Sequence, residues 1–485
     1  MNLENYQIAK NVHLYQHQGL NIAYDVNSGS LHLLDTKTYN YIQEMVDLQN
    51  RSVNNPCETQ NILECAGSWL NPAERMEILQ ELGELQAQHL LFSPEINKVD
   101  LNYPKEPIIK AMCLHVAHDC NLRCRYCFAG TGSFGGKRKL MSLETGKLAL
   151  AFLLEHSGDR PQCEVDFFGG EPLLNFPVVR ELVAYGREIA RKAGKKIKFT
   201  LTTNAVLLNE DIADFLEKEE VAVVLSLDGR QEINDRMRSF ANGQGSYEQI
   251  VPLIQEFIKK RPDTSPYALG KYYYVRGTYT HYNPDFYQDV LHLADLGIKR
   301  ISLEPVVALS GEDYALKEED IPMVMDSYDI LGEKVLEYKQ QGREFSFFHF
   351  NAGLDEGPCL PKRLSGCGAG HEYVAISPEG DIYPCHQFVG QEKYRLGTLV
   401  HPGQELLPAL VEKFRQANIY AKEECVYCWA RFSCSGGCHA ANVAYSGELT
   451  KVYPLNCALQ KKRLEIAYYL KIKEAQAKAL LADNF

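Results

Sequence analysis

Three cysteines in the segment CNLRCRYC, namely Cys120, Cys124 and Cys127, are the residues whose spacing most directly points to chemistry. Three thiolates hold three irons of a tetranuclear iron–sulfur cluster and leave the fourth iron without a protein ligand. A cluster closed by four side chains stores electrons, whereas an open one also binds a reactant. A zinc site or unrelated core cysteines would show the same spacing, so neighbouring segments must decide.

The segment FFGGEP places Gly169, Gly170 and Glu171 at the end of a predicted strand. Two residues without a Cβ let a bulky ligand lie against the backbone, and the Glu171 carboxylate can accept a hydrogen bond from an ammonium group. Alone, this pattern is typical of an ordinary strand-to-loop turn. Beside the cysteine triad, it indicates a site for a small charged molecule.

The region 355–465 holds eight cysteines among glycines and turns, with little periodicity. We expect bound metal to hold such a region folded. The spacing C-x2-C-x5-C-x3-C near residue 430 is also compatible with a zinc ribbon.

Composition narrows the class of protein. The chain has 485 residues, 45% of them hydrophobic and 24% charged, as in globular proteins of roughly two to four domains. A net charge of −12 and the lack of a basic stripe argue against nucleic acid as a partner. No segment resembles a signal peptide or a membrane helix, so we expect a soluble cytoplasmic protein whose 15 cysteines are metal ligands more than disulfides.

The elements that would position these residues follow from periodicity. Alternating residues over 13–46, with a bend at Asn27-Ser28-Gly29, predict a hairpin, helical patterns follow at 37–48 and 73–90, and 92–107 reads as a linker. Six apolar strands then alternate with helices, which predicts an α/β fold with a parallel sheet curved into a partial (β/α)6 barrel. The predicted strands are 108–117, 164–170, 197–204, 221–229, 272–280 and 299–307, and the predicted helices among them are 143–156, 175–193 and 247–260.

The triad follows the first of these strands, at the carboxyl rim where such barrels carry their chemistry. We expect an N-terminal α+β module over 1–105, the barrel over 106–325, a bridging helix and strand over 326–354, the cysteine-rich region over 355–465 and a terminal helix over 466–485, with helical periodicity from 458 to 482.

The pairing of CNLRCRYC with GGEP resembles the radical S-adenosylmethionine (radical SAM) enzymes. The resemblance implies that the open iron of a [4Fe-4S] cluster binds S-adenosylmethionine and that its cleavage yields a hydrogen-abstracting radical. By similarity, Ser226 and Asp228 of SLDG and Arg238 of NDRMR line the cofactor, together with Gly169, Gly170 and Glu171, and Phe128 covers the adenine edge. A capped turn, surface charge and a core aromatic are the structural alternatives for these residues.

The C-terminal cysteines resemble the SPASM domain of peptide-modifying members of that group, which carries two auxiliary [4Fe-4S] clusters. The outer cluster would be held by Cys425, Cys428, Cys434 and Cys457, and the inner one by Cys367, Cys385 and Cys438. Cys359 is a candidate fourth ligand of the inner cluster. If it does not bind, that iron is open to a substrate thiolate.

Longer segments, including GCGAGHEYVAISPEGDIYPCHQFVG, resemble the maturases of SCIFF and ranthipeptide precursors, the freyrasin type included. That group joins a cysteine sulfur to a carbon of a nearby residue, threonine or aspartate among them, in a ribosomal peptide. The resemblance implies a thioether-forming oxidoreductase with three clusters and an external low-potential electron donor. It also implies a winged-helix-like N-terminal module that binds the precursor's leader peptide. Oxidation of a peptide Cys or Ser to formylglycine and, outside enzymes, a zinc-bound scaffold remain alternatives.

The sequence leaves the roles of a few further residues undecided. Cys57 and Cys65 are expected to be inert thiols, and Cys113 and Cys163 core residues. Arg276 and Glu304 lie inside predicted strands and either face the cofactor cavity or form a buried ion pair.

Overall fold

The computed structural model describes residues 3, 6–54, 62–96, 106–261, 272–308, 311–351, 360–401 and 406–482. Cys57, Cys359 and residues 97–105 of the predicted linker lie outside the described residues. Two sheets organise the rest, a three-stranded antiparallel sheet near the N-terminus and an 11-stranded, mostly parallel sheet. None of the helices in the described part of the chain is both long and apolar enough to span a bilayer.

The N-terminal sheet has the order β1-β2-β3, with β1 at Val12–His17, β2 at Leu20–Asp25 and β3 at Leu31–Leu34. The predicted bend joins β2 to β3, and the Asp25 carboxylate accepts the backbone N–H groups of Asn27 and Ser28 at 3.1 and 2.8 Å. A second turn, at Gln18 and Gly19 with φ of 46° and 74°, was not predicted. It divides the expected first strand, so the single hairpin becomes three strands.

Four helices accompany this sheet: α1 (Ile8–Asn11), α2 (Thr36–Asn54), α3 (Ile62–Cys65) and α4 (Pro72–Ala87). The start of α4 follows from its sequence, since Asn71 and Glu74 form a capping box and Pro72 occupies the first helical position.

The large sheet confirms the predicted alternation of strands and helices. Its strands run in the order β11-β10-β9-β8-β7-β6-β4-β12-β13-β14, with β5 beside β4, and all pairs from β4 to β11 along this path are parallel. The strands are β4 (Ala111–His118), β5 (Lys139–Leu140), β6 (Gln162–Gly169), β7 (Lys196–Thr203), β8 (Ala222–Ser226), β9 (Tyr273–Tyr279), β10 (Arg300–Pro305), β11 (Ser346–Phe347), β12 (Tyr373–Ile376), β13 (Asp381–Tyr383) and β14 (Gly397–Thr398).

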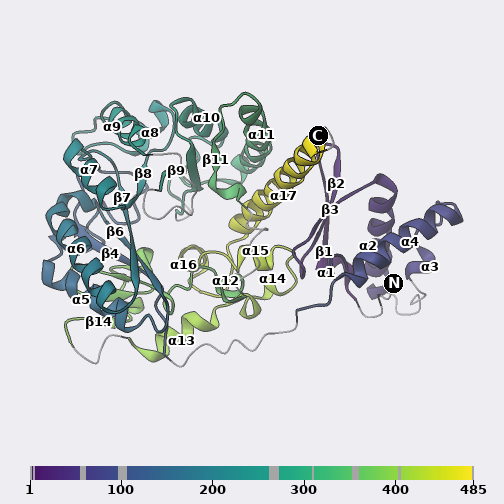
Figure 1. The fold of residues 1–485 in the computed structure, drawn as a ribbon, viewed down its shortest axis with the longest axis horizontal. Helices are drawn as coiled ribbons and strands as arrows, with labels where there is room; N and C mark the ends of the chain where they lie inside the picture. The colour runs from purple at the N-terminus through teal and green to yellow at the C-terminus, as the bar shows by residue number, and fades with distance from the viewer. Residues whose placement is uncertain are drawn as a thin grey trace.

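Helices cover the outside of the parallel strands (Figure 1). They are α5 (Leu143–Glu155), α6 (Phe176–Lys192), α7 (Glu210–Lys218), α8 (Gln231–Met237), α9 (Tyr247–Lys259), α10 (Tyr287–Asp295) and α11 (Ile321–Gln340). The C-terminal region adds α12 (Leu360–Ser365), α13 (Pro408–Gln416), α14 (Glu423–Val426), α15 (Arg431–Cys434), α16 (His439–Ser446) and α17 (Pro454–Ala482).

The two faces of the parallel sheet differ in burial. On β9, Tyr273, Val275 and Tyr279 are buried in the main core, which also contains residues of the covering helices. Tyr274 and Arg276 point to the opposite face and keep part or most of their surface exposed. Asp166 and Phe168 on β6 also lie on this face and are only partly buried. The inside of the curved sheet is therefore a solvent-accessible, largely polar hollow, not a packed core.

Helix α17 lies between the barrel and the N-terminal sheet (Figure 1). The Tyr15 hydroxyl donates to the carbonyl oxygen of Glu465 at 2.8 Å, and the rings of Tyr24 and Tyr468 stack at 4.6 Å. Both α11 and α17 are continuous across the boundaries expected at residues 325 and 465. Both helices start earlier than predicted, and Val324 and Leu455 in their first turns pack in or against the main core.

Candidate active site

The loop after β4 brings the three predicted thiols Cys120, Cys124 and Cys127 together. Burial raises the pKa of Cys120 to about 12 and that of Cys124 to about 11. The carboxylate of Glu171 adds to the increase at Cys120, and neighbouring thiols of the triad add at both. Such thiols lose their protons when a cation sits among them, because coordination offsets the cost of the negative charge.

Gly169 and Gly170 allow a close backbone approach between β6 and the cysteine loop. A Cβ on Gly169 would lie 2.2 Å from the carbonyl oxygen of Ala117, and one on Gly170 would lie 2.2 Å from that of Asp119. The backbone N–H groups of Gly170 and Glu171 donate to these same oxygens, both at 2.8 Å. The missing Cβ atoms thus let the end of β6 lie directly against the cysteine loop, and the expected ligand contact at these glycines stays a prediction.

Glu171 is fully buried beside that loop. It accepts hydrogen bonds from the Thr203 hydroxyl at 2.7 Å and from the backbone N–H groups of Asn204 and Leu173 at 2.8 and 3.0 Å. Burial raises its pKa to about 7 in spite of these bonds. The Asn204 amide also donates to the sulfur of Cys120 at 3.6 Å, which ties Glu171 to the triad. Sequence reasoning missed Thr203 and Asn204, whose only signal is their place at the carboxyl end of β7.

Asp228 and Arg238 meet at Tyr126, another residue that sequence reasoning missed although it lies within the triad. The Tyr126 hydroxyl donates to Asp228 at 2.6 Å and accepts from Arg238 at 3.0 Å, and the backbone N–H of Thr278 donates to Asp228 at 3.0 Å. Arg238 is buried, its charge lowers the pKa of Cys124, and its Nε has no partner among the residues that the structure describes. A buried cation next to the thiols thus keeps one donor unused.

Ser226 and Phe128 flank this group. Ser226 ends β8, is half-buried and lies in register with Arg276 of β9. The Phe128 side chain is 50% exposed, and its ring lies 5.9 Å from that of Phe134 and 5.6 Å from that of His386. Phe128 therefore reaches from the triad loop to the cysteine-rich region.

The structure also gathers the seven described cysteines of the C-terminal region into two groups. The thiols of Cys367, Cys385 and Cys438 lie close enough for Cys438 to raise the pKa of both others, after burial as the main cause. Cys127 and Cys385 pack in the same cluster of side chains, so this inner group and the triad lie on neighbouring parts of the fold.

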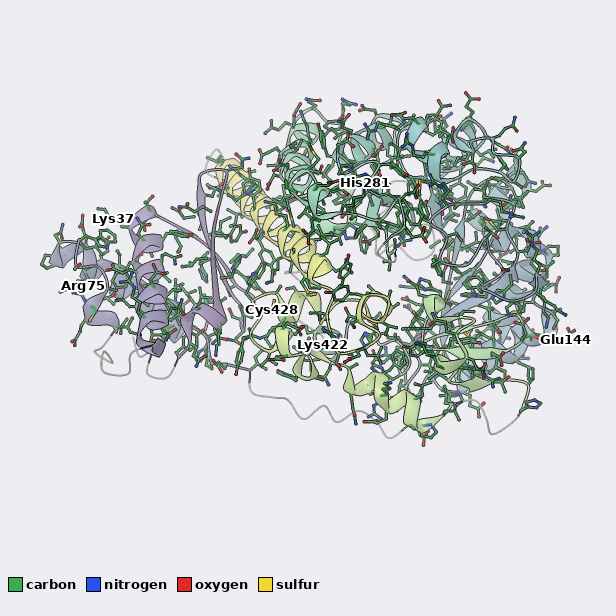
Figure 2. The ribbon with its side chains drawn as sticks, turned by 180° about the vertical axis from the view of Figure 1, so that it is seen from behind. Lys37, Arg75, Glu144, His281, Lys422 and Cys428 are labelled. Atoms are coloured by element: carbon green, nitrogen blue, oxygen red, sulfur yellow. The ribbon has the colours of Figure 1, made fainter. Side chains whose placement is uncertain are left out.

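The outer group consists of Cys425, Cys428, Cys434 and Cys457. Burial raises the pKa of Cys425, Cys434 and Cys457, and neighbouring thiols of the group, Cys428 included, add to the increase. Lys422 lies near thiols of both groups. Figure 2 labels it in the same region of the molecule as Cys428 of the outer group. It is fully buried and donates to the carbonyl oxygen of Gly436 at 2.6 Å. Burial lowers its pKa, while thiols of both groups raise it. Sequence reasoning missed Lys422, since a lysine three residues before a cysteine gives no signal of burial.

The loop between these cysteines also contacts the N-terminal sheet. Trp429 stacks on His13 of β1, with ring centroids 3.8 Å apart. Buried Arg431 donates to the carbonyl oxygen of Lys10 at 2.9 Å and to the side-chain oxygens of Asn11 and Asn27 at 3.0 and 3.4 Å.

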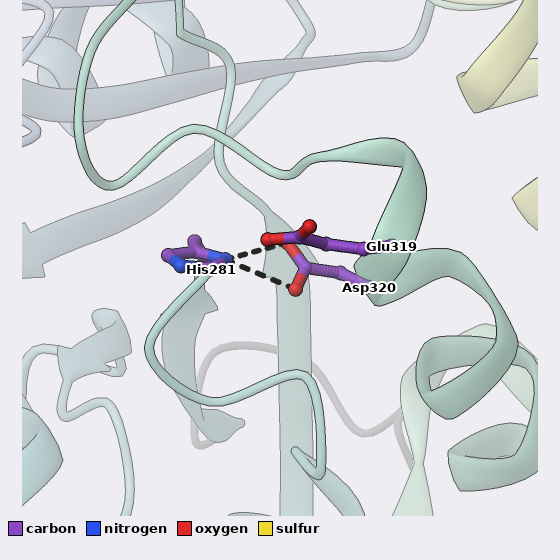
Figure 3. Close-up of side chains that lie close together, drawn as sticks. All are labelled: His281, Glu319 and Asp320. Carbon is purple, nitrogen blue, oxygen red and sulfur yellow. Dashed lines mark hydrogen bonds and ion pairs between the residues drawn. The ribbon is translucent and has the colours of Figure 1, made fainter.

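The thiol groups are more open than a zinc site. Within the described part of the chain, only His281, Glu319 and Asp320 place three ligand atoms within 4.8 Å of one another (Figure 3). Tetrahedral zinc with Zn–S bonds of about 2.3 Å requires sulfurs about 3.8 Å apart. The His281 trio is already satisfied, because Nδ1 bonds Asp320 at 2.9 Å and Nε2 bonds the Lys317 ammonium at 3.0 Å.

Arg276 and Glu304 do not pair with each other. The Glu304 oxygens contact His349 at 3.1 Å and Arg463 at 3.4 Å. Burial would raise the Glu304 pKa, but these cations and Arg276 hold it well below its usual range. Arg276 faces the hollow without forming an ion pair or hydrogen bond with any residue that the structure describes.

Comparison with known proteins places these features in a family. Residues 114–272 match the radical SAM superfamily. The mycofactocin maturase MftC of Mycobacterium ulcerans is 30% identical over 345 residues, 68% of this chain and 83% of that protein. A cysteine-type anaerobic sulfatase-maturating enzyme of Clostridium perfringens is 25% identical over 342 residues, 68% of this chain and 89% of that protein.

Solved structures agree on the fold. Native anSMEcpe with bound AdoMet and the Cp18Cys peptide superposes with a TM-score of 0.61 at 21% identity, over 76% of this chain and 99% of that one. Streptococcus suis SuiB bound to S-adenosylmethionine gives a TM-score of 0.52 at 19% identity, over 92% and 98%. The chain therefore belongs to the radical SAM superfamily and is an enzyme of its peptide-maturase family.

Proposed function

We propose that this enzyme installs thioether crosslinks between a cysteine sulfur and a carbon of an acceptor residue in a ribosomally made precursor peptide. The observation that carries the proposal is that two three-thiol groups, the triad and the inner group, each contribute a cysteine to one cluster of packed side chains. An enzyme that makes a carbon radical at one end of a cavity and holds a substrate sulfur at the other would need this arrangement.

The residues around the triad fit S-adenosylmethionine. Bound to the open iron of a [4Fe-4S] cluster and reduced by one electron from an external donor, it would supply a 5′-deoxyadenosyl radical that removes a hydrogen atom. Buried Glu171 would accept from its ammonium group, and the unused Nε donor of Arg238 would suit its carboxylate. The sulfur spacing, wider than a zinc site requires, supports clusters at the other two thiol groups as well.

The inner group would hold the substrate cysteine. Among the described residues it offers three thiols, and we propose that its remaining iron position takes the substrate thiolate, with Cys359 as the alternative ligand. Forming the crosslink removes the thiol proton and one carbon-bound hydrogen from the peptide. The hydrogen leaves with deoxyadenosine, and the surplus electron passes to the clusters.

The N-terminal module, residues 1–105, would bind the leader peptide. Within the described residues, β3 pairs with β2 on one side and with no strand on the other. An extended leader could add a strand at this edge and gain main-chain hydrogen bonds.

The decisive experiment incubates the anaerobically reconstituted enzyme with synthetic cysteine-rich peptides made from the open reading frames that flank its gene. We expect about twelve irons per chain, deoxyadenosine release under reduction and a product that lacks two hydrogens per crosslink and resists thiol alkylation. Cys120→Ala should release no deoxyadenosine. A product that reacts with hydrazine would indicate formylglycine formation instead, and zinc as the dominant metal without deoxyadenosine would indicate a scaffold.

A further inference from the structure

Arg276 is an exposed cation on the inner face of the barrel. It stands in the middle of β9, paired in register with Ser226 on one side and Ser302 on the other, and faces the hollow. It forms no hydrogen bond or ion pair with any residue that the structure describes. Its planar set of N–H donors is therefore available to a ligand.

The nearby carboxylates are already engaged. Both Glu304 oxygens are occupied by His349 and Arg463, and Asp166 accepts from the Thr202 hydroxyl at 3.2 Å. Glu304 thus attracts Arg276 through space but bonds other partners, which leaves the guanidinium of Arg276 open to a ligand carboxylate.

The position of Arg276 shows which ligand group would meet it. Its neighbour Ser226 is expected to line the cofactor. Arg276 faces the same hollow as Phe168, whose ring lies 5.2 Å from that of His386, the residue after Cys385. Arg276 therefore lies on the face of the sheet that the triad and the inner thiol group share. A substrate residue at this point is placed for loss of its hydrogen, while the cysteine to be joined would sit farther along.

We propose that Arg276 binds the side-chain carboxylate of the acceptor residue, so that the peptide's acceptor is an aspartate or glutamate and not a threonine. The inference rests on the proposed thioether-forming function. Guanidinium and carboxylate match in a planar, two-bond arrangement that neither threonine nor an amide reproduces. The cofactor's own carboxylate is the competing anion, and Arg238, closer to the triad, is the residue available for it.

The test uses three synthetic precursors that carry the neighbouring gene's leader, one Cys and either Asp, Asn or Thr at the acceptor position. Wild-type enzyme should crosslink the Asp peptide with at least about tenfold higher kcat/KM than the other two. Arg276→Gln should lower this value about 10- to 100-fold for the Asp peptide and change it less than about threefold for Asn and Thr. Arg276→Lys should give a kcat/KM for the Asp peptide between those of wild type and Arg276→Gln.

Deoxyadenosine release without peptide is measured on every variant, so that an effect on cofactor cleavage is separated from an effect on peptide binding. Arg343→Gln, at an exposed arginine paired with Asp295, is the matched control and should behave as wild type on all peptides. Equal losses on the three peptides would assign Arg276 a merely structural role, and loss of peptide-independent deoxyadenosine would assign it to the cofactor. A Thr peptide crosslinked as well as the Asp peptide would overturn the inference and leave the thioether function intact. Failure to crosslink any of the three peptides would contradict both the acidic-acceptor inference and the thioether-forming function.

Discussion

Gly170→Ala tests whether the contact between β6 and the cysteine loop positions the triad. The added Cβ would lie 2.2 Å from the carbonyl oxygen of Asp119, 2.6 Å from its carbon and 2.9 Å from the Cα of Gly132. All three are backbone atoms, so no side chain can rotate away. The loop and the strand end must separate by about 1 Å, at a cost of about 1–3 kcal/mol in stability.

This displacement falls on the two groups that would hold the cofactor. Asp119 precedes Cys120 directly, and Glu171 follows Gly170, so the triad moves relative to Glu171 by a similar distance. Misplacement of about 1 Å lowers rates about 100-fold when catalysis depends on alignment. We expect Gly170→Ala to retain most of its iron and to release deoxyadenosine about 100-fold more slowly under reduction.

The assay measures deoxyadenosine by chromatography, with iron content and melting temperature determined on the same preparation. Gly136→Ala is the matched control, because it lies in the same loop and its nearest atom to an added Cβ is the Ser133 oxygen at 3.5 Å. It should match wild type in rate and stability. A Gly170→Ala enzyme with full iron and an unchanged rate would refute the positioning argument.

Three further outcomes are expected. Cys425→Ala should leave some deoxyadenosine release but give no crosslinked peptide, and normal product would contradict the assignment of the outer thiol group. Burial raises the pKa of Asp166 from 3.8 to about 7, so its contribution to stability is complete below pH 3.8 and lost as the pH rises through 7. The melting temperature of Asp166→Asn relative to wild type should therefore increase from pH 4 to pH 8, and a constant difference would argue against the raised pKa. Arg431→Met removes three hydrogen bonds to the N-terminal module and should weaken its docking by about 2–4 kcal/mol. Limited proteolysis should then cleave the module faster than in wild type. An unchanged cleavage pattern would show that the module docks without Arg431.

The parts of this fold that could be predicted are those determined by local sequence pattern. Six strands such as β6 and β10 were identified because a continuous or alternating apolar run ends at a turn signal within the chain itself. The turn at Gln18 was missed because a non-glycine residue takes a left-handed conformation there. Tyr126 and Lys422 were missed for another reason. Their surroundings are built by segments far away in sequence, as the bond from Tyr126 to Asp228 illustrates.

The docking of the Trp429 loop on β1 has a thermodynamic consequence. Because the same short segment that presents the outer thiols also seats the N-terminal sheet, anything that orders it from one side favours order on the other. Linkage makes the effect mutual: iron bound at the outer thiols would stabilise the docked N-terminal module by the same factor by which docking would strengthen iron binding. Metal binding at the outer thiols and docking of the N-terminal module would then be thermodynamically coupled.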